Sequence, residues 1–175
     1  MDSSGHLYPH RAQTMHPYSS SGWIEVIVGC MESGKTEELR RRVRRALIAG
    51  KRISLFTYAS AEIAPELFEV RTRDGRSVRA QPATSSEGLM ALVRDASEVI
   101  AVDEVHFFDE GVVDVLHELA SQGREVLCAG LDMDYRGHVF GPVGRLLAES
   151  EVVDKLYAVC TPVSYTHLTL PTKRI

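Results

Sequence analysis

Residues 23–39 read WIEVIVGCMESGKTEEL, and this stretch decides the fold of the chain. Its apolar first half is typical of a buried strand, and helical character begins within a turn of the first glycine. The spacing G-x-x-x-x-G-K-[ST] is met by Gly29, Gly34, Lys35 and Thr36. A chance match in a glycine-containing turn would lack the strand before it and the helix after it. We therefore predict a loop that binds the phosphates of a nucleotide.

Each residue type in this loop has a chemical reason to be there. Glycine lets the backbone turn tightly enough to aim several N–H groups at one anion, and the next helix adds the partial positive charge of its N-terminus. The Lys35 ammonium can reach the β- and γ-phosphate oxygens, and the Thr36 hydroxyl can ligate Mg²⁺. The predicted nucleotide-binding residues of the loop are Gly29, Cys30, Met31, Glu32, Ser33, Gly34, Lys35 and Thr36.

Composition narrows the class of protein. The chain has 175 residues, 44% hydrophobic and 25% charged, which suits one soluble α/β domain with its own core. A net charge of −4 argues against a nucleic-acid duplex or an anionic membrane as the main partner, although local basic patches could still attract either of them. No run approaches the ~18 apolar residues of a membrane span. Cys30, Cys128 and Cys160 form no CxxC pair, which suits a reducing cytoplasm.

We divide the chain into three parts. Residues 1–21 mix Ser, His, Pro and Tyr without a period and lack the apolar segment of a signal peptide, so we expect a disordered tail. Its histidines at 6, 10 and 16 are irregularly spaced, and we interpret them as incidental rather than metal-binding. Residues 22–160 form the predicted nucleotide-binding domain. Residues 161–175 form an atypical tail.

Strands and helices alternate along the domain. The first predicted helix runs from Ser33 or Gly34 to about Gly50. A strand at 52–58 and a hairpin at Asp74-Gly75 follow. Next come a helix with a capping box from Thr84 to Glu87 and inward Leu89, Leu92, Val93 and Ala96, and a strand that begins at Glu98 and comprises EVIAVDEVHFF. The remaining predicted segments are a helix capped by Asp109 and closed by Gly123, a strand at 125–130, a Gly- and Pro-rich loop, a short helix at 145–149 and a strand at 152–159. This alternation predicts a mostly parallel sheet with helices on both faces, the architecture of phosphate-loop NTPases.

The first helix has two different faces. Its buried stripe is predicted to be Leu39, Val43, Ala46 and Leu47. The other face carries Arg40, Arg41, Arg42, Arg44 and Arg45. We interpret that face as solvated or as an oligomer contact, with Glu37 and Glu38 paired to Arg41 and Arg42.

Two acids follow the third predicted strand. Residues 99–102 are apolar and deliver Asp103 and Glu104 to the carboxyl end of the strand, where open α/β sheets place ligands. An acid beside a phosphate loop is what Mg²⁺ requires, so Asp103 is the candidate metal ligand together with Thr36. Glu104 can then act on the group that attacks the γ-phosphate.

Three longer stretches resemble the thymidine kinases of the type shared by bacteria and the human cytosol. They are GCMESGKTEELRRRVRRA, VIAVDEVHFFD and GLDMDYRGHVFGPVGRLLAESEVVDKLYAVC, and the resemblance covers residues 22–160. It implies ATP-dependent phosphorylation of the 5′-hydroxyl of thymidine by a cytoplasmic homotetramer. It also implies that Glu104 is the catalytic base and that Asp103, Glu104, Val105 and His106 complete the nucleotide site. The residues that fall where the family walls the thymine ring are Met31, Phe107, Leu131 and Tyr135.

The chain also departs from that family. Glu32 stands where the family usually has Phe, His106 where it has Gln, and the segment after strand two lacks its arginine-containing element. The family has a zinc site of two Cys-x-x-Cys pairs around a loop that closes over the nucleoside. Here Cys160 stands in the first position, Val163 in the second, and the rest of the tail resembles nothing in the family. We interpret this tail as a frameshift, read-through or assembly product, and expect zinc binding and nucleoside enclosure to be lost because one cysteine cannot hold Zn²⁺.

Two functions follow from these patterns. The first is a thymidine kinase that uses ATP and Mg²⁺. The alternative is a phosphate-loop protein that binds or slowly hydrolyses ATP without kinase activity, because the segment that encloses the nucleoside is missing. A phosphate-transfer assay with the four deoxynucleosides separates the two.

Overall fold

A computed structural model describes residues 22–62, 68–160 and 165–167 of the chain. Six strands form one sheet in the order β5-β2-β6-β7-β1-β8, and every neighbouring pair in it is parallel. The elements are β1 (Trp23–Gly29), α1 (Lys35–Ile48), β2 (Ile53–Tyr58), β3 (Glu69–Arg71), β4 (Ser77–Arg79), β5 (Gln81–Ala83), α2 (Ser86–Leu92), β6 (Val99–Asp103), η1 (Val105–Phe107), α3 (Gly111–Ser121), β7 (Glu125–Leu131), α4 (Val143–Glu149), β8 (Val152–Leu156), β9 (Ala158–Cys160) and β10 (Tyr165–His167). Because the strands are parallel, all of them end at one edge of the sheet.

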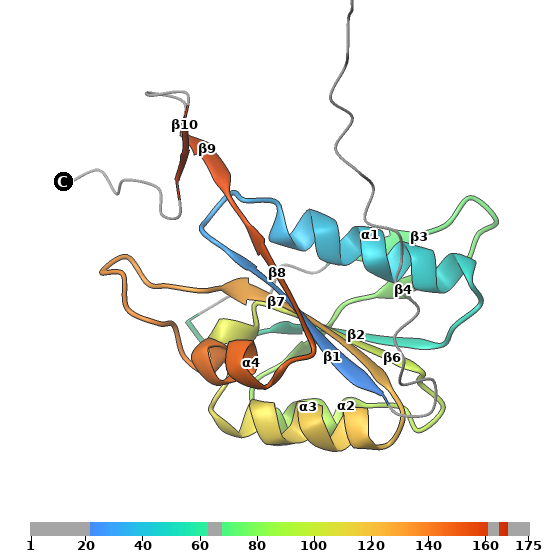
Figure 1. Cartoon of the computed structure of the whole chain (residues 1–175). Coiled ribbons are helices and arrows are strands. Elements are labelled where there is room, and N and C mark those ends of the chain that lie inside the picture. The colour runs from blue at the N-terminus through green and yellow to red at the C-terminus, as the bar shows by residue number, and fades with distance from the viewer. Residues whose placement is uncertain (1–21, 63–67, 161–164, 168–175) are drawn as a thin grey trace, which may run out of the picture.

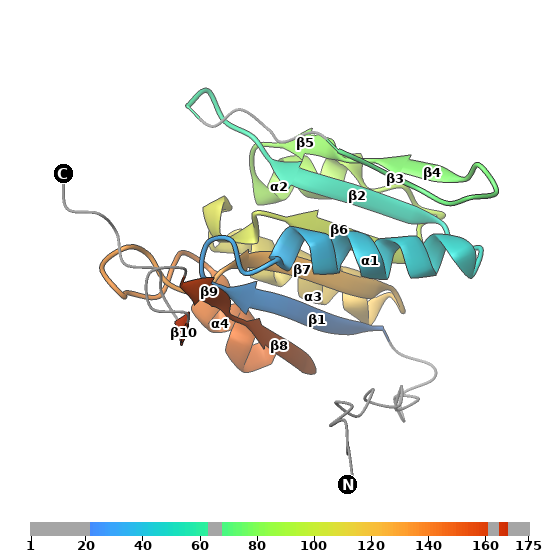
Figure 2. The ribbon, with the colours of Figure 1, turned by 90° about the horizontal axis from the view of Figure 1, so that it is seen from above.

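Helices cover both faces of this sheet (Figures 1 and 2). Helix α1 and the β3–β4 hairpin lie on one face, and α2, α3 and α4 lie on the other. Adjacent residues of β1 point to opposite faces, so that Val26 packs against the second layer and Ile27 against α1. The predicted α/β architecture is confirmed. No helix among the described residues is long and apolar enough to cross a membrane.

The first helix has the predicted apolar stripe, but its basic face is not uniformly solvated. Leu39, Val43, Ala46 and Leu47 are buried as expected. Arg42 is an exception to the prediction of a solvated arginine face, because only 16% of its side chain is exposed.

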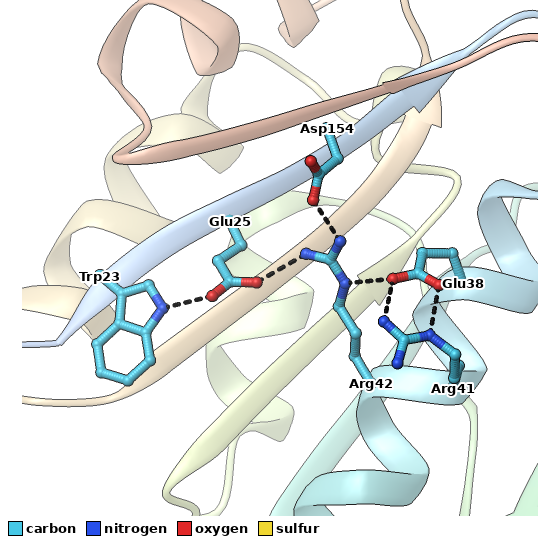
Figure 3. A network of polar contacts seen from close by, with 6 residues as sticks. All are labelled: Trp23, Glu25, Glu38, Arg41, Arg42 and Asp154. Carbon is cyan, nitrogen blue, oxygen red and sulfur yellow. Dashed lines mark hydrogen bonds and ion pairs between the residues drawn. The ribbon is translucent and has the colours of Figure 1, made fainter. Parts of the chain in front are cut away.

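Figure 3 shows where Arg42 points. Its guanidinium donates to Glu25 of β1 at 2.7 Å, to Glu38 at 2.9 Å and to Asp154 of β8 at 2.5 Å. Glu38 also accepts from Arg41, so this glutamate alone makes the two pairs that we expected of Glu37 and Glu38. Because α1 crosses over β1 and β8, the Arg42 side chain faces two carboxylates of the sheet rather than water.

The segment between β4 and β6 differs most from the sequence-based prediction. The cap of α2 is Ser85, whose hydroxyl accepts from the Gly88 N–H at 3.1 Å, and not Thr84. The helix ends at Leu92 because Val93 is extended, and both Leu92 and Ala96 are exposed rather than inward. Strand β5 was not predicted, since it has three residues and contains a proline. As an edge strand it pairs only with β2 in the six-stranded sheet.

Turns set the ends of several other strands and helices. Strand β6 ends at Asp103, and the residues after it form η1, so the predicted strand was too long. The β3–β4 hairpin turns at Asp74-Gly75 as predicted. Asp109 accepts from the Gly111 N–H at the start of α3, and Gly123 follows its end with φ of 85°. The last predicted strand is divided at Tyr157 into β8, which joins the main sheet, and β9, which pairs antiparallel with β10.

Candidate active site

The phosphate-binding loop follows β1 at the edge where the strands end. Gly29 lies so close to β8 that a Cβ atom there would be 2.3 Å from the Leu156 carbonyl oxygen. Gly34, just before α1, has φ of 85° and ψ of 20°, a left-handed conformation that glycine adopts without strain. Glu32 also has a positive φ, of 59°. The loop therefore needs glycine at both predicted positions, once for space and once for conformation.

Lys35 lies at the centre of the site. Its Nζ donates to the Cys30 carbonyl oxygen of the same loop at 2.6 Å. Burial lowers the pKa of this lysine, and the nearby Glu104, Cys30, Asp103 and Asp132 oppose that shift. The ammonium is thus held over the loop and surrounded by acidic side chains from other strand ends.

Two of these acids come from the end of β6. Asp103 is 4% exposed, and its Oδ1 accepts from the Glu104 N–H at 3.0 Å. Glu104 has a left-handed backbone with φ of 55°, which is unusual for a residue other than glycine. This conformation turns the chain sharply, so the Glu104 side chain, 37% exposed, lines the pocket beside Lys35. The structure brings together the predicted metal ligand, base and phosphate-binding lysine.

His106 is buried directly behind Glu104. Its Nδ1 accepts from the Leu131 N–H at 3.1 Å, so the proton of the neutral ring must be on Nε2. Nε2 lies 3.3 Å from Glu104 Oε2. Burial, followed by the charge of Lys35, lowers the pKa of His106 to about 4. The ring is therefore neutral at physiological pH, and its Nε2 lies beside the Glu104 carboxylate without making a hydrogen bond in the described structure.

A pocket of about 470 Å³ opens over these groups. It is lined by Met31, Glu32, Gly34, Lys35, Thr36, Glu37, Thr57, Tyr58, Glu104, His106, Phe107 and Leu131. Aromatic rings cluster at one side of it. Phe107 lies 5.6 Å from Tyr58, and Phe140 packs edge-on against both His106, at 4.6 Å, and Phe107, at 5.5 Å, between ring centroids. The pocket thus joins a charged phosphate end to an aromatic end.

The remaining predicted residues differ in how they relate to this pocket. Met31, Phe107 and Leu131 line it, and Met31 is 65% exposed. Cys30 and Val105 are buried and do not line it. Tyr135 is 72% exposed on the loop after β7, outside the pocket lining, where Arg136 stacks on its ring at 5.0 Å. The side chain of Cys160 and residue 163 lie outside the described residues, as do residues 1–21, so those expectations stay predictions.

Sequence reasoning missed several residues of the site. Thr57 and Tyr58, at the end of β2, line the pocket, and Phe140 of the loop after β7 packs against the His106 ring without lining it. Asp132 follows β7 and is 2% exposed, with the Lys155 Nζ of β8 at 2.8 Å from its Oδ2. The rule that acids after apolar strands lie at the ligand edge would have found Asp132. Nothing in the sequence brings Phe140 to His106.

The donor set fits Mg²⁺ better than zinc. Mg²⁺ is usually held by one or two carboxylates together with phosphate oxygens and water, which Asp103 and the Thr36 hydroxyl can complete beside a phosphate loop. In the described ranges no three His, Cys, Asp or Glu side chains converge as a metal centre. The buried Ser33 hydroxyl has no hydrogen-bond partner in the described structure, which leaves a donor within the loop for an anion.

Comparison with known proteins decides the family. The model of the family described as Thymidine kinase matches residues 22–170. The chain belongs to the thymidine kinase family. This match runs ten residues beyond the stretch 22–160 on which the sequence resemblance rests, into the tail that we predicted to be atypical, and it supports a kinase-type phosphotransferase.

A solved structure confirms the fold of this family member independently. The Legionella pneumophila ATPase DotB superposes with a TM-score of 0.50 at 17% sequence identity. The superposition covers 84% of this chain but only 43% of the DotB chain, so this chain spans less than half of that protein. At this identity the likeness establishes the phosphate-loop fold alone.

Burial of His106 should make the stability of this family member depend on pH. Its folded pKa of about 4 lies below the unfolded value of 6.5, so below pH 6.5 the unfolded chain binds the proton more readily. The contribution of neutral, buried His106 to the free energy of unfolding is present above pH 6.5. It is lost as the pH falls toward 4, by about 3 kcal/mol in total. Urea unfolding at pH 7 and pH 4.5 measures it.

His106→Gln supplies the comparison, because glutamine does not titrate and is the residue that the family usually has. We expect wild type to lose about 2 kcal/mol more free energy of unfolding than this variant between the two pH values. The faces of the ring meet Phe107 and Phe140, and the charged neighbours are Glu104 and Lys35. Equal losses in the two proteins would mean that His106 is not held neutral by burial.

Proposed function

We propose that this chain transfers the γ-phosphoryl group of ATP to the 5′-hydroxyl of thymidine. The observation that carries the proposal is that Lys35, Asp103 and Glu104 converge beside one pocket whose other end is aromatic. An ATPase needs the charged end alone. A nucleoside kinase needs both ends, because its second substrate carries a flat base and a hydroxyl that must meet the γ-phosphate.

Each group at the charged end of the pocket has a role in binding or orienting the nucleotide. The backbone N–H groups of the loop and the Lys35 ammonium bind the β- and γ-phosphate oxygens. Thr36 and Asp103 are the residues that would hold Mg²⁺, which neutralises negative charge on those oxygens when it is bound. The site then positions the γ-phosphorus for in-line attack, and most of the rate enhancement comes from positioning and charge.

Glu104 takes the proton of the attacking hydroxyl. As the 5′-oxygen bonds to the γ-phosphorus, its proton moves to the Glu104 carboxylate, and the bond to the β–γ bridging oxygen breaks to release ADP. The His106 ring packs beside Glu104, with Nε2 3.3 Å from Glu104 Oε2 and no hydrogen bond between them in the described structure. His106 is therefore a positioning residue for the base, in the place where the family usually has an amide.

The aromatic end fits a pyrimidine. Phe107, Leu131 and Met31, which the family resemblance predicts around the base, line the pocket together with Tyr58, and Phe140 packs edge-on against Phe107 outside that lining. Flat apolar surfaces bury a base, and a small number of polar groups at its edge set which base is accepted. Tyr135 would join this wall only if the loop after β7 moved toward the pocket.

A transfer assay with [γ-³²P]ATP and each of the four deoxynucleosides tests the proposal. Labelled thymidine monophosphate should form faster than any other product. Release of labelled inorganic phosphate without a labelled nucleotide would instead identify an ATP-hydrolysing protein.

The C-terminal tail leads to a separate prediction. The phosphate-binding groups lie at the ends of β1 and β6, so the chain should bind Mg-ATP whatever follows Cys160. Thymidine should bind poorly if the tail lacks the segment that closes over the nucleoside, since an open site gives up burial and backbone hydrogen bonds.

Replacing the residues after Cys160 by a family-like segment with paired cysteines should raise kcat/KM for thymidine and introduce bound zinc. The two proteins are compared by steady-state kinetics and by metal analysis. Equal kcat/KM, with zinc absent from both, would show that this tail is not a damaged lid.

A further inference from the structure

A second hollow, of about 660 Å³, lies at the edge of the sheet where the strands begin. Its walls come from the start of β2, from β4 and from the segment between α2 and β6. Strand β2 connects the two pockets, because Thr57 and Tyr58 at its end line the active site and Arg52 and Ile53 at its start line this hollow. With about 3.3 Å per residue, the two openings are roughly 20 Å apart.

The lining of this hollow is strongly basic. Five cationic side chains line it and no carboxylate does; they are Lys51, Arg52, Arg76, Arg79 and Arg94. This is a local reversal of the net charge of −4. An apolar floor is supplied by Leu47, Ile53 and Val78. A concave surface lined by several cations and by apolar groups is suited to a small anion of high charge.

Two of the cations are held in place by backbone carbonyl groups. Arg52 Nε donates to the Ala96 carbonyl oxygen, and Arg76 Nη2 donates to the Ile48 carbonyl oxygen at the end of α1 at 3.3 Å. The second contact also satisfies a helix C-terminus, which is a structural reason for Arg76. The guanidinium groups of Arg79 and Arg94 make no hydrogen bond or salt bridge within the described ranges, although Arg79 lies opposite Glu69 of β3 and helps to lower the pKa of that carboxyl.

The other three cations of the hollow make ion pairs that would compete only weakly with a bound anion. Lys51 pairs with Glu125 at 2.5 Å, Arg52 with Glu98 at 3.5 Å and Arg76 with Asp74 at 2.5 Å. All three pairs are solvent-exposed on at least one side, and such pairs contribute only about 0–1 kcal/mol. An anion that engages several cations at once can displace them.

We propose that this hollow binds the oligophosphate chain of a small molecule, such as a nucleoside triphosphate, at a site separate from the active-site loop. Arg79 and Arg94 are the main contacts, because their guanidinium groups would break no hydrogen bond or salt bridge of the described structure, and Arg52 and Arg76 are prepositioned in the same hollow. A long nucleic acid is disfavoured. The acids that surround the hollow, Asp74, Glu98 and Glu125, would repel a polyanion that extends beyond it.

Calorimetry with inorganic tripolyphosphate tests this site in the full chain. The background variant is Lys35→Ala, which removes the strongest cation of the active-site loop. We expect this background to bind one equivalent of tripolyphosphate. Adding Arg79→Gln and Arg94→Gln should weaken binding at least tenfold, since each removes a charge-assisted contact.

The matched control adds Arg44→Gln and Arg73→Gln to the same background. These two arginines are exposed and outside the hollow, so the control has the same net charge as the test variant. Its affinity should stay within twofold of the background. A cooperative thermal transition without ligand would show that both variants are folded, and the tripolyphosphate-induced rise in Tm should persist in the control and be lost in the test variant.

Three results would overturn the proposal. They are no binding by the Lys35→Ala background, an equal loss of affinity in the test and control variants, and binding of a 16-nucleotide oligo(dT) that depends on Arg79 and Arg94 while tripolyphosphate does not bind. If the active-site loop of the Lys35→Ala background still binds one equivalent of tripolyphosphate, the background should bind two equivalents in total. The test variant should then lose the equivalent bound in the hollow, and the control should keep it.

Discussion

Lys35→Ala should weaken binding of Mg-ATP at least 100-fold and abolish measurable phosphoryl transfer. The side chain reaches over the loop to the Cys30 carbonyl oxygen, so its ammonium is already held where a bound nucleotide would place its phosphates. Charge-assisted contacts to phosphate are each worth about 1.5–3 kcal/mol, and a lysine that touches two phosphates makes more than one. Titration calorimetry with a non-hydrolysable ATP analogue measures the effect.

Arg44→Ala is the matched control for this experiment. Arg44 lies on the same helix, is exposed, and carries the same charge, so the variant loses one positive charge without touching the pocket. Its affinity for nucleotide should stay within twofold of wild type. Unchanged ATP affinity in Lys35→Ala would count against the assignment of residues 29–36 as the phosphate-binding loop.

Glu104→Gln should retain Mg-ATP binding and lower kcat by ~10² or more, as expected when a general base is removed. Glutamine has nearly the same shape and can keep the left-handed backbone at little extra cost, since φ of 55° is imposed by the turn after β6. It cannot accept the proton of the 5′-hydroxyl. The effect should therefore fall on kcat, with little change in the KM for ATP.

Glu110→Gln is the corresponding control, because Glu110 is an exposed residue six positions later that lies outside the pocket. Steady-state kinetics with saturating thymidine and ATP should leave this variant close to wild type. If Glu104→Gln keeps kcat within a few-fold, another group takes the proton. Asp132, the further buried acid near Lys35, would then be the first to test.

Local patterns were sufficient for the parts of the site that lie close together in sequence. The loop between β1 and α1 combines a strand, two glycines and a helix start within a few residues, and each part has its own sequence signal. Asp103 follows an apolar run whose length matches one buried strand, so its place at the ligand edge follows from parallel topology. The buried stripe of α1 was equally readable from its spacing.

Errors arose where a weak local signal competed with packing. Thr84 and Ser85 are both good caps, and the choice of Ser85 depends on Ser86 being bonded to Asp109 of a distant loop. Strand β5 forms although Gln81, Pro82 and Ala83 have low strand propensity, because β2 offers an open edge to pair with. Neither preference is visible in a window of neighbouring residues.

The sequence by itself determined the α/β architecture, the phosphate loop and the acids beside it, because strand and helix periodicity and the spacing of a tight turn are properties of short segments. Only the tertiary structure decided what those residues face. Arg42 is neutralised by Glu25 and Asp154 because α1 crosses β1 and β8, and His106 keeps its proton on Nε2 because the Leu131 N–H lies opposite Nδ1. These contacts join residues 17 to 112 positions apart, so they depend on how the layers pack and on nothing that a local pattern encodes.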